Sequence, residues 1–198
     1  MEKETVQVSP YGVGQYVKVI DGLFHKKTME KFHRICKELD FEDAKVGGGD
    51  ETQVNKNIRN TKTLCWHRYG KKLTHVHWCN YFINVTHDAI QKFYKLDAPE
   101  AIVKKTNNIN VLKYEEGGFY RPHVDHFDRI PRTISVITFI NNDFEGGYFE
   151  IFSPDKKESQ KIKPEPGRTV IFPSNFLYPH KANEVTKGTR YAVVLWYL

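Results

Sequence analysis

Two histidines and one aspartate have residue types and spacing that suit a metal site. His123 and Asp125 form a His-x-Asp motif, and His180 follows further along the chain. On a strand, residues two apart point to the same side, so His123 and Asp125 can face one ion. Two imidazoles and one carboxylate form the facial ligand set that holds non-haem Fe(II) and leaves positions open for substrate and oxygen. An isolated His-x-Asp pair arises often by chance, and the alternative is a surface histidine beside a solvated aspartate.

Arg190 lies after His180 and begins a mostly apolar run. An arginine at the start of a core strand is costly unless a buried anion pairs with it. Its planar guanidinium can bind both oxygens of a carboxylate. We therefore expect Arg190 to bind a cosubstrate carboxylate. The alternative is a strand-end arginine that points to water.

The composition predicts one globular domain. The chain has 198 residues, which is enough for a sizeable core. Its three cysteines form no Cys-x-x-Cys pair, which argues against a disulfide framework and fits a reducing compartment. No apolar run approaches the roughly 18 residues of a membrane span, and the charged start at residues 1–5 does not resemble a signal peptide. We expect a cytoplasmic protein.

The formal net charge is +6. A basic surface can attract nucleic acid or acidic peptides. Here the lysines and arginines are spread along the chain, which favours a solvated surface and argues against a nucleic-acid partner.

The first half of the chain predicts helices, because a single proline precedes residue 99. Residues 15–20 read as a strand, and Asp21 or Thr28 could cap the helix after it. Apolar residues at helical spacing predict a second helix over 77–96. Residues 44–63 between these helices read as a long surface loop, for which a substrate lid is one interpretation. Arg59 in this basic loop is a candidate substrate contact.

Short strands follow in the second half, which predicts a sandwich or barrel. Helices first and strands after indicate an α+β fold with the helices packed on one sheet. The expected strands cover residues 109–114, 133–140, 147–152, 169–172 and 190–197.

The region from Asn107 to Leu198 resembles the Fe(II)- and 2-oxoglutarate-dependent dioxygenases, specifically their prolyl 4-hydroxylase branch. Features that agree in order and spacing carry this resemblance. They are Tyr114, His123-Val124-Asp125, the turn Asp143–Gly147, the Pro-x-x-Gly turn Pro164–Gly167, His180, Arg190 and Trp196.

The resemblance implies a double-stranded β-helix (jelly-roll) in a single domain, with helical support and a substrate loop in 1–106 and the catalytic β core in 107–198. It implies Fe(II) on His123, Asp125 and His180. It also implies 2-oxoglutarate bound through Arg190 and Tyr114 in a pocket that Trp196 helps to line. Other members of the family often need ascorbate.

The implied reaction uses O2 and converts 2-oxoglutarate to succinate and CO2. It hydroxylates a peptide or protein proline, as a procollagen-proline or peptidyl-proline 4-dioxygenase does. One alternative is the same chemistry on a free amino acid, another side chain or nucleic acid. The nucleic-acid demethylase branch usually has a second arginine where this chain has Trp196, which disfavours that substrate. Another alternative is a basic β-sandwich binding module without catalysis.

Three other candidates have simpler interpretations. His126 would face away from the metal on a regular strand. His75 and His77 would point in nearly opposite directions on a helix, so a shared ion is not expected. Cys65 reads as a small buried residue rather than a nucleophile.

Overall fold

The computed structural model describes residues 6–8, 16–47, 52–93 and 106–198. The first part of the described chain contains β1 (Val6–Val8), β2 (Lys18–Ile20), α1 (Lys26–Lys37), β3 (Glu42–Asp43), β4 (Arg59–Asn60), β5 (Lys62–His67) and α2 (Leu73–Phe93). The second part contains β6 (Asn108–Tyr114), β7 (Phe119–His123), β8 (Ile134–Phe139), β9 (Glu145–Gly146), β10 (Phe149–Phe152), β11 (Ser159–Ile162), β12 (Thr169–Pro173), β13 (His180–Ala182), β14 (Val185–Lys187) and β15 (Arg190–Tyr197).

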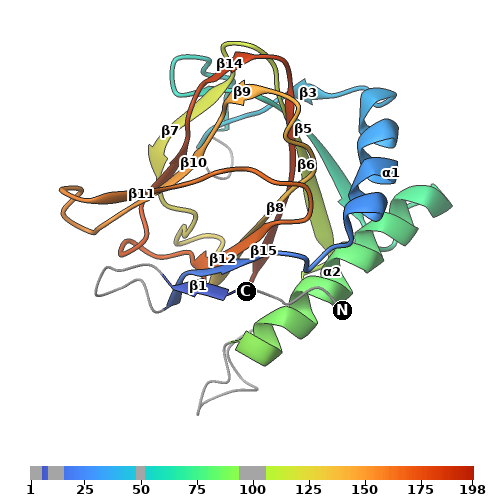
Figure 1. The fold of residues 1–198 in the computed structure, drawn as a ribbon, viewed down its shortest axis with the longest axis horizontal. Helices are drawn as coiled ribbons and strands as arrows, with labels where there is room; N and C mark the ends of the chain where they lie inside the picture. The colour runs from blue at the N-terminus through green and yellow to red at the C-terminus, as the bar shows by residue number, and fades with distance from the viewer. Residues whose placement is uncertain (1–5, 9–15, 48–51, 94–105) are drawn as a thin grey trace.

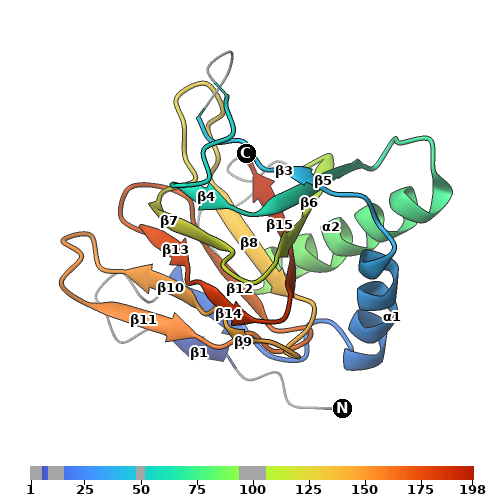
Figure 2. The same ribbon diagram turned by 90° about the horizontal axis from the view of Figure 1, so that it is seen from above.

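Two antiparallel sheets face each other, and the helices cover the outside of the larger one (Figure 1). The eight-stranded sheet has the order β1-β2-β12-β8-β15-β6-β5-β3, and the five-stranded sheet has the order β11-β10-β13-β7-β4. Figure 2 shows both helices on the side of the larger sheet that faces away from β7, β10 and β13. The arrangement is a double-stranded β-helix, which confirms the predicted fold class.

The larger sheet is apolar on both faces because it separates two cores. Phe32 and Phe82 of the helices pack with Trp66 in the outer core. Phe149 and Phe172 pack together between the sheets, with ring centroids 5.5 Å apart. A strand buried on both faces needs a nearly continuous apolar sequence. The residues of β15 after Arg190 form such a sequence.

Strand β15 shows how alternation divides these cores. Odd residues from Tyr191 to Tyr197 face the helices, and even residues face the space between the sheets. Side chains alternate across a strand, so Arg190 shares the inner face with Ala192 and Val194. The strand thus places an arginine inside the barrel.

Two expectations for the first half of the chain were wrong. The N-cap of α1 is His25, whose Nδ1 accepts from the backbone N–H of Lys27. Asp21 is instead paired with Arg168, so it does not cap the helix. The predicted loop over 44–63 contains β4, and β5 begins within its last residues. No helix in the described part of the chain is long and apolar enough to cross a membrane.

Candidate metal centre

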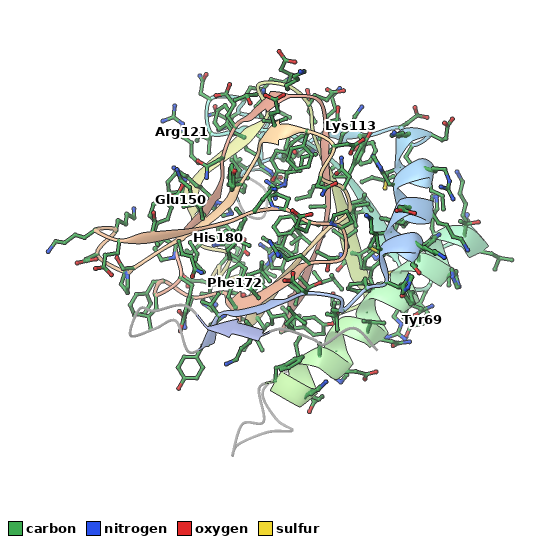
Figure 3. All side chains as sticks on the ribbon, viewed as in Figure 1. Tyr69, Lys113, Arg121, Glu150, Phe172 and His180 are labelled. Carbon is green, nitrogen blue, oxygen red and sulfur yellow. The ribbon has the colours of Figure 1, made fainter. Side chains whose placement is uncertain are left out.

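Two adjacent strands, β7 and β13, bring the predicted ligands together. His123 ends β7 and His180 begins β13, and the two residues are register partners across the antiparallel pair. Asp125 lies two residues beyond the end of β7, and its backbone N–H donates to the Ser174 carbonyl. His180 and Phe172 lie inside the ribbon, whereas Arg121 and Tyr69 lie at its periphery (Figure 3).

The three side chains form a compact group. One ligand atom from each of His123, Asp125 and His180 lies within 4.8 Å of the others. The His123 Nε2 lies 3.6 Å from Asp125 Oδ1, and the His180 Nε2 lies 3.5 Å from Asp125 Oδ2. The structure therefore places three donor atoms around one small volume.

Backbone carbonyls fix the tautomers of both imidazoles. The Nδ1 of His123 lies 2.8 Å from the Arg121 carbonyl, and the Nδ1 of His180 lies 3.0 Å from the Tyr178 carbonyl. A carbonyl oxygen only accepts, so each Nδ1 carries the proton and donates. In the neutral rings the Nε2 lone pairs then face the carboxylate. Three converging lone pairs repel one another unless a cation lies between them, so this donor set fits a divalent metal ion.

Asp125 is held in its ionised form. Burial by itself would raise its pKa, but the neighbouring His180 and His123 and the hydrogen bond from Ser135 hold the pKa well below its usual range. The Ser135 hydroxyl donates to Asp125 Oδ2 at 2.7 Å and lies 2.8 Å from the Ser174 hydroxyl. These hydroxyls orient the carboxylate toward the two histidines.

His180 is held in its neutral form. Its side chain is 3% exposed, and burial together with the nearby His123 lowers its pKa to about 4. The rings of Phe172 and Phe149 pack against it, with centroids 4.8 Å and 5.4 Å away. Neutral imidazole and ionised carboxylate are the forms that bind a metal.

Arg190 lies in the same pocket without an anionic partner. It is 2% exposed, and burial lowers the pKa of its guanidinium. Its Nε and Nη1 have no hydrogen-bond partner among the described residues. Instead the guanidinium carbon lies over the rings of Tyr114, at 4.8 Å, and Phe139, at 5.2 Å. Unpaired buried donors are rare. The positive charge and the free N–H groups of Arg190 suit a bound carboxylate.

The pocket contains every predicted site residue. Its lining includes Arg59, Tyr114, His123, Asp125, His180, Arg190 and Trp196. It also includes residues that the sequence reasoning did not select. Tyr120 stacks on His123 with centroids 3.6 Å apart, and Arg132 donates from Nη1 to the Asp125 carbonyl. Phe149 also lines the pocket.

The remaining candidates lie elsewhere. His75 stacks on Trp66 with centroids 4.1 Å apart, which accounts for it without a metal. His126 is exposed, and its Nδ1 lies 3.0 Å from the Arg132 carbonyl. Cys65 is exposed, so the expectation that it is buried was wrong. It lies on β5, where the partly exposed pattern of Lys62–His67 leaves this side chain at the surface.

The model of the family described as the 2OG-Fe(II) oxygenase superfamily matches residues 109–198. Those residues belong to this superfamily. The oxygenase region contains the triad, Tyr114, Arg190 and Trp196, whereas Arg59 lies before it. This confirms the family that the sequence resembles.

Curated relatives match a shorter segment. Over 67 residues the chain is 42% identical to prolyl 3-hydroxylase 1 of Gallus gallus and 43% identical to prolyl 3-hydroxylase 2 of Homo sapiens. Each match covers 33% of this chain and only 9% or 10% of the relative. The chain thus matches about a tenth of the length of these relatives, so their whole-protein activities do not transfer directly.

Solved structures match nearly the whole chain. A Pseudomonas putida prolyl-4-hydroxylase has a TM-score of 0.70 at 16% identity, over 92% of this chain and 91% of that one. A prolyl hydroxylase in complex with a hypoxia inducible factor oxygen degradation domain peptide fragment, from Trichoplax adhaerens, has a TM-score of 0.74 at 18% identity. That match covers 93% of this chain and 84% of the other. At these identities the likeness shows the shared oxygenase fold.

Proposed function

We propose that this protein is an Fe(II)- and 2-oxoglutarate-dependent dioxygenase that hydroxylates proline in a peptide or protein. One observation carries the proposal. A two-histidine, one-carboxylate cluster and a buried arginine with unpaired donors line the same pocket. The first group fits Fe(II), and the second fits the distal carboxylate of a dicarboxylic cosubstrate.

Each predicted residue has a role in this proposal. His123, Asp125 and His180 would hold Fe(II), and Arg190 would bind the far carboxylate of 2-oxoglutarate. When bound, the iron and its cosubstrate supply the oxidation by O2, with succinate and CO2 as coproducts. Tyr114 and Trp196 would line the cosubstrate pocket. The ring of Tyr114, next to the Arg190 guanidinium, fixes where that guanidinium lies.

The protein's own contribution is orientation and exclusion of water. The carbonyls at Arg121 and Tyr178 fix both imidazoles, and Ser135 fixes the carboxylate. The two phenylalanines against His180 keep that side of the site apolar. A dry pocket strengthens the attraction between Arg190 and a carboxylate, because the local dielectric constant is low.

Relatives support proline as the substrate. The Trichoplax adhaerens neighbour is a prolyl hydroxylase with a bound peptide fragment, and the curated relatives are prolyl 3-hydroxylases. The structural neighbours include a prolyl-4-hydroxylase, which supports hydroxylation at the 4-position. Product analysis distinguishes the two ring positions.

Further expectations accompany this proposal. We propose one catalytic domain over 1–198, with support and a substrate loop in 1–106 and the β core in 107–198. The cysteines Cys36, Cys65 and Cys79 are unpaired, which supports a reducing, cytoplasmic setting. Ascorbate is proposed as the reductant that maintains Fe(II).

An anaerobic titration with Fe(II) and 2-oxoglutarate tests the cosubstrate site. Chelation of the keto acid to iron is expected to give a weak visible charge-transfer band. The band should be absent in His180→Ala and retained in His126→Ala, which removes a histidine outside the triad. No band at saturating iron would contradict the proposal and favour a binding module. Proline peptides incubated with Fe(II), 2-oxoglutarate and O2 should then gain the mass of one oxygen.

A further inference from the structure

The mouth of the proposed active site is lined by three cations. Lys45, Arg59 and Arg132 line the pocket outside the metal cluster, and Asp125 is the only carboxylate in the described lining. Among the described residues, no carboxylate forms an ion pair with any of the three. No described carboxylate therefore neutralises the positive charge of the mouth by an ion pair.

Cofactor binding would not remove this excess. The inner site is neutral once loaded: the charges of Fe(II) and Arg190 are balanced by Asp125 and the two carboxylates of 2-oxoglutarate. The three mouth cations remain. Arg59 and Arg132 line the same pocket, so an anion that enters the mouth would face two guanidinium groups.

Arg59 is held where such an anion would meet it. It lies on β4, opposite Tyr120 on β7, and its guanidinium carbon is 4.7 Å from the Tyr120 ring centroid. Its Nη1 donates to the Lys45 carbonyl at 3.3 Å, while its buried Nε has no partner among the described residues. Tyr120 in turn stacks on His123. The arginine is thus one aromatic ring away from a predicted metal ligand.

We propose that this mouth selects peptides that carry an aspartate or glutamate side chain close to the hydroxylated residue, and that Arg59 binds that carboxylate. The inference rests on the proposed function, because it assigns a substrate class to the same site. A guanidinium fixed by a ring and a carbonyl loses little freedom when it pairs with a carboxylate. Tyr120 sets the spacing between the bound carboxylate and the metal cluster.

A nucleic acid also carries anions, but the described mouth favours a peptide. Three cations confined to one pocket suit one or two carboxylates rather than a phosphate backbone, which needs a longer basic track. Arg132 covers Trp196, with its guanidinium carbon 3.8 Å from the indole ring centroid. A nucleic-acid base therefore cannot stack on that face of Trp196 while Arg132 occupies it.

Matched peptides test the inference by binding. The peptides are alanine-based with a central proline. Each peptide carries a single glutamate at one of the three positions on either side of the proline, and its match carries glutamine at the same position. Fluorescence anisotropy measures their affinity for protein loaded with Mn(II) and 2-oxoglutarate. We expect the best glutamate peptide to bind about tenfold or more tightly than its glutamine match, the size of a charge-assisted hydrogen bond.

Variants identify the residue responsible. In Arg59→Gln the preference for glutamate should fall below about twofold, and Arg59→Lys should retain part of it because the charge remains. The control is Arg68→Gln. Arg68 also lies over a tyrosine ring, that of Tyr69 at 5.6 Å, but it does not line the pocket. This variant should keep the full preference.

The outcomes separate the inference from the proposed function. Equal binding of glutamate and glutamine peptides, or an unchanged preference in Arg59→Gln, would overturn the inference even if proline peptides gain oxygen. A competition experiment tests the nucleic-acid alternative. The inference would also be overturned if a short single-stranded oligonucleotide displaced the bound glutamate peptide at a lower concentration than free glutamate peptide does. A missing iron–2-oxoglutarate band would instead contradict the proposed function, whichever peptide binds.

Discussion

Tyr120 stacks on His123 with ring centroids 3.6 Å apart and planes 21° from parallel, although the two residues are three positions apart on β7. On a regular strand, residues three apart point to opposite faces. The register explains the exception, because His180 pairs with His123 while Ala182 pairs with Tyr120. Strand β7 thus carries one extra residue at this point, a β-bulge that contains Pro122. The bulge places a mouth residue and a predicted metal ligand on the same face.

The Ser135 hydroxyl is expected to matter for metal affinity. Ser135→Ala removes the hydrogen bond at 2.7 Å to Asp125 Oδ2, so the carboxylate loses part of its orientation. Loss of a hydrogen-bond partner of a metal ligand typically lowers metal affinity about 10- to 100-fold. Calorimetric titration with Mn(II) measures the change.

Thr138→Val is the matched control for Ser135→Ala. It also removes a buried hydroxyl from β8, but that hydroxyl pairs with Thr169, 3.0 Å away, and does not reach Asp125. Metal affinity should be unchanged in this variant. Equal losses in both variants would show that the effect arises from general damage to β8.

Replacing Arg190 should have opposite effects on stability and cosubstrate binding. In the cofactor-free protein Arg190 is a buried charge without an anionic partner among the described residues. Arg190→Met should therefore raise the free energy of unfolding, by about 1–3 kcal/mol. The same variant should bind 2-oxoglutarate about 100-fold more weakly, since a buried charge pair is lost.

Urea denaturation and a 2-oxoglutarate titration measure the two effects. The control is Arg168→Met, which breaks an arginine pair with both Asp21 oxygens on the surface of the sheet. It should lower the free energy of unfolding by about 1 kcal/mol and leave cosubstrate affinity unchanged. A lower free energy of unfolding in Arg190→Met would count against an unpaired buried charge at this position.

Gly147 is expected to determine where the Arg190 side chain lies. Its φ is +60°, and a Cβ there would lie 2.8 Å from Phe144 Cε2 and 3.3 Å from Arg190 Cδ. Gly147→Ala should therefore lower the free energy of unfolding by about 1–2 kcal/mol and displace the guanidinium. We expect weaker 2-oxoglutarate binding with Mn(II) affinity retained, both by calorimetry. Gly22→Ala, at φ +74° with open space around it, controls for backbone strain alone.

The sequence could predict the parts of the site that follow strand alternation. The apolar run after Arg190 predicts a strand buried on both faces, and β15 follows it over Arg190–Tyr197. Alternation then places Arg190 on the inner face. His123 and His180 lie at the ends of adjacent strands. The His-x-Asp pair was a weak signal by itself, and its order and spacing with His180, Arg190 and Trp196 selected the ligands.

The sequence could not predict the features that depend on distant partners. The bulge in β7 depends on its register with β13, and without it Tyr120 would point away from His123. Arg132 reaches the site because it packs on Trp196, which lies far along the chain. Strand β5 has no clean alternation of buried and exposed residues, since it pairs between β6 and the short β3.

The cysteines are expected to differ sharply in reactivity. Cys65 is exposed, whereas burial raises the pKa of Cys36 to about 12 and that of Cys79 to about 11. A disulfide reagent at pH 8 should therefore label one thiol in the folded protein and three in urea. Cys65→Ser should abolish the fast reaction, and labelling of Cys36 without denaturant would contradict the burial of α1.

Glu115 provides a pH-dependent contribution to stability. Hydrogen bonds from Lys113 and Lys62, both at 2.8 Å, lower its pKa from 4.5 to about 2. A carboxylate with a lowered folded-state pKa stabilises the protein above its unfolded pKa, and this stabilisation is lost as the pH falls from about 4.5 toward 2. The side chain is 46% exposed, so solvent screening limits the effect to about 1 kcal/mol or less.

Glu115→Gln should therefore lower the free energy of unfolding at pH 7 by up to about 1 kcal/mol. Its difference from the unmodified protein should narrow below pH 4.5 and shrink in 1 M NaCl, because salt screens exposed pairs. Urea denaturation between pH 7 and pH 3 measures both trends. Glu145→Gln is the control, since Glu145 pairs only with exposed Lys187 at 3.3 Å among the described residues. A Glu115→Gln difference that is constant with pH would show that the carboxylate's charge contributes nothing and that packing accounts for the change.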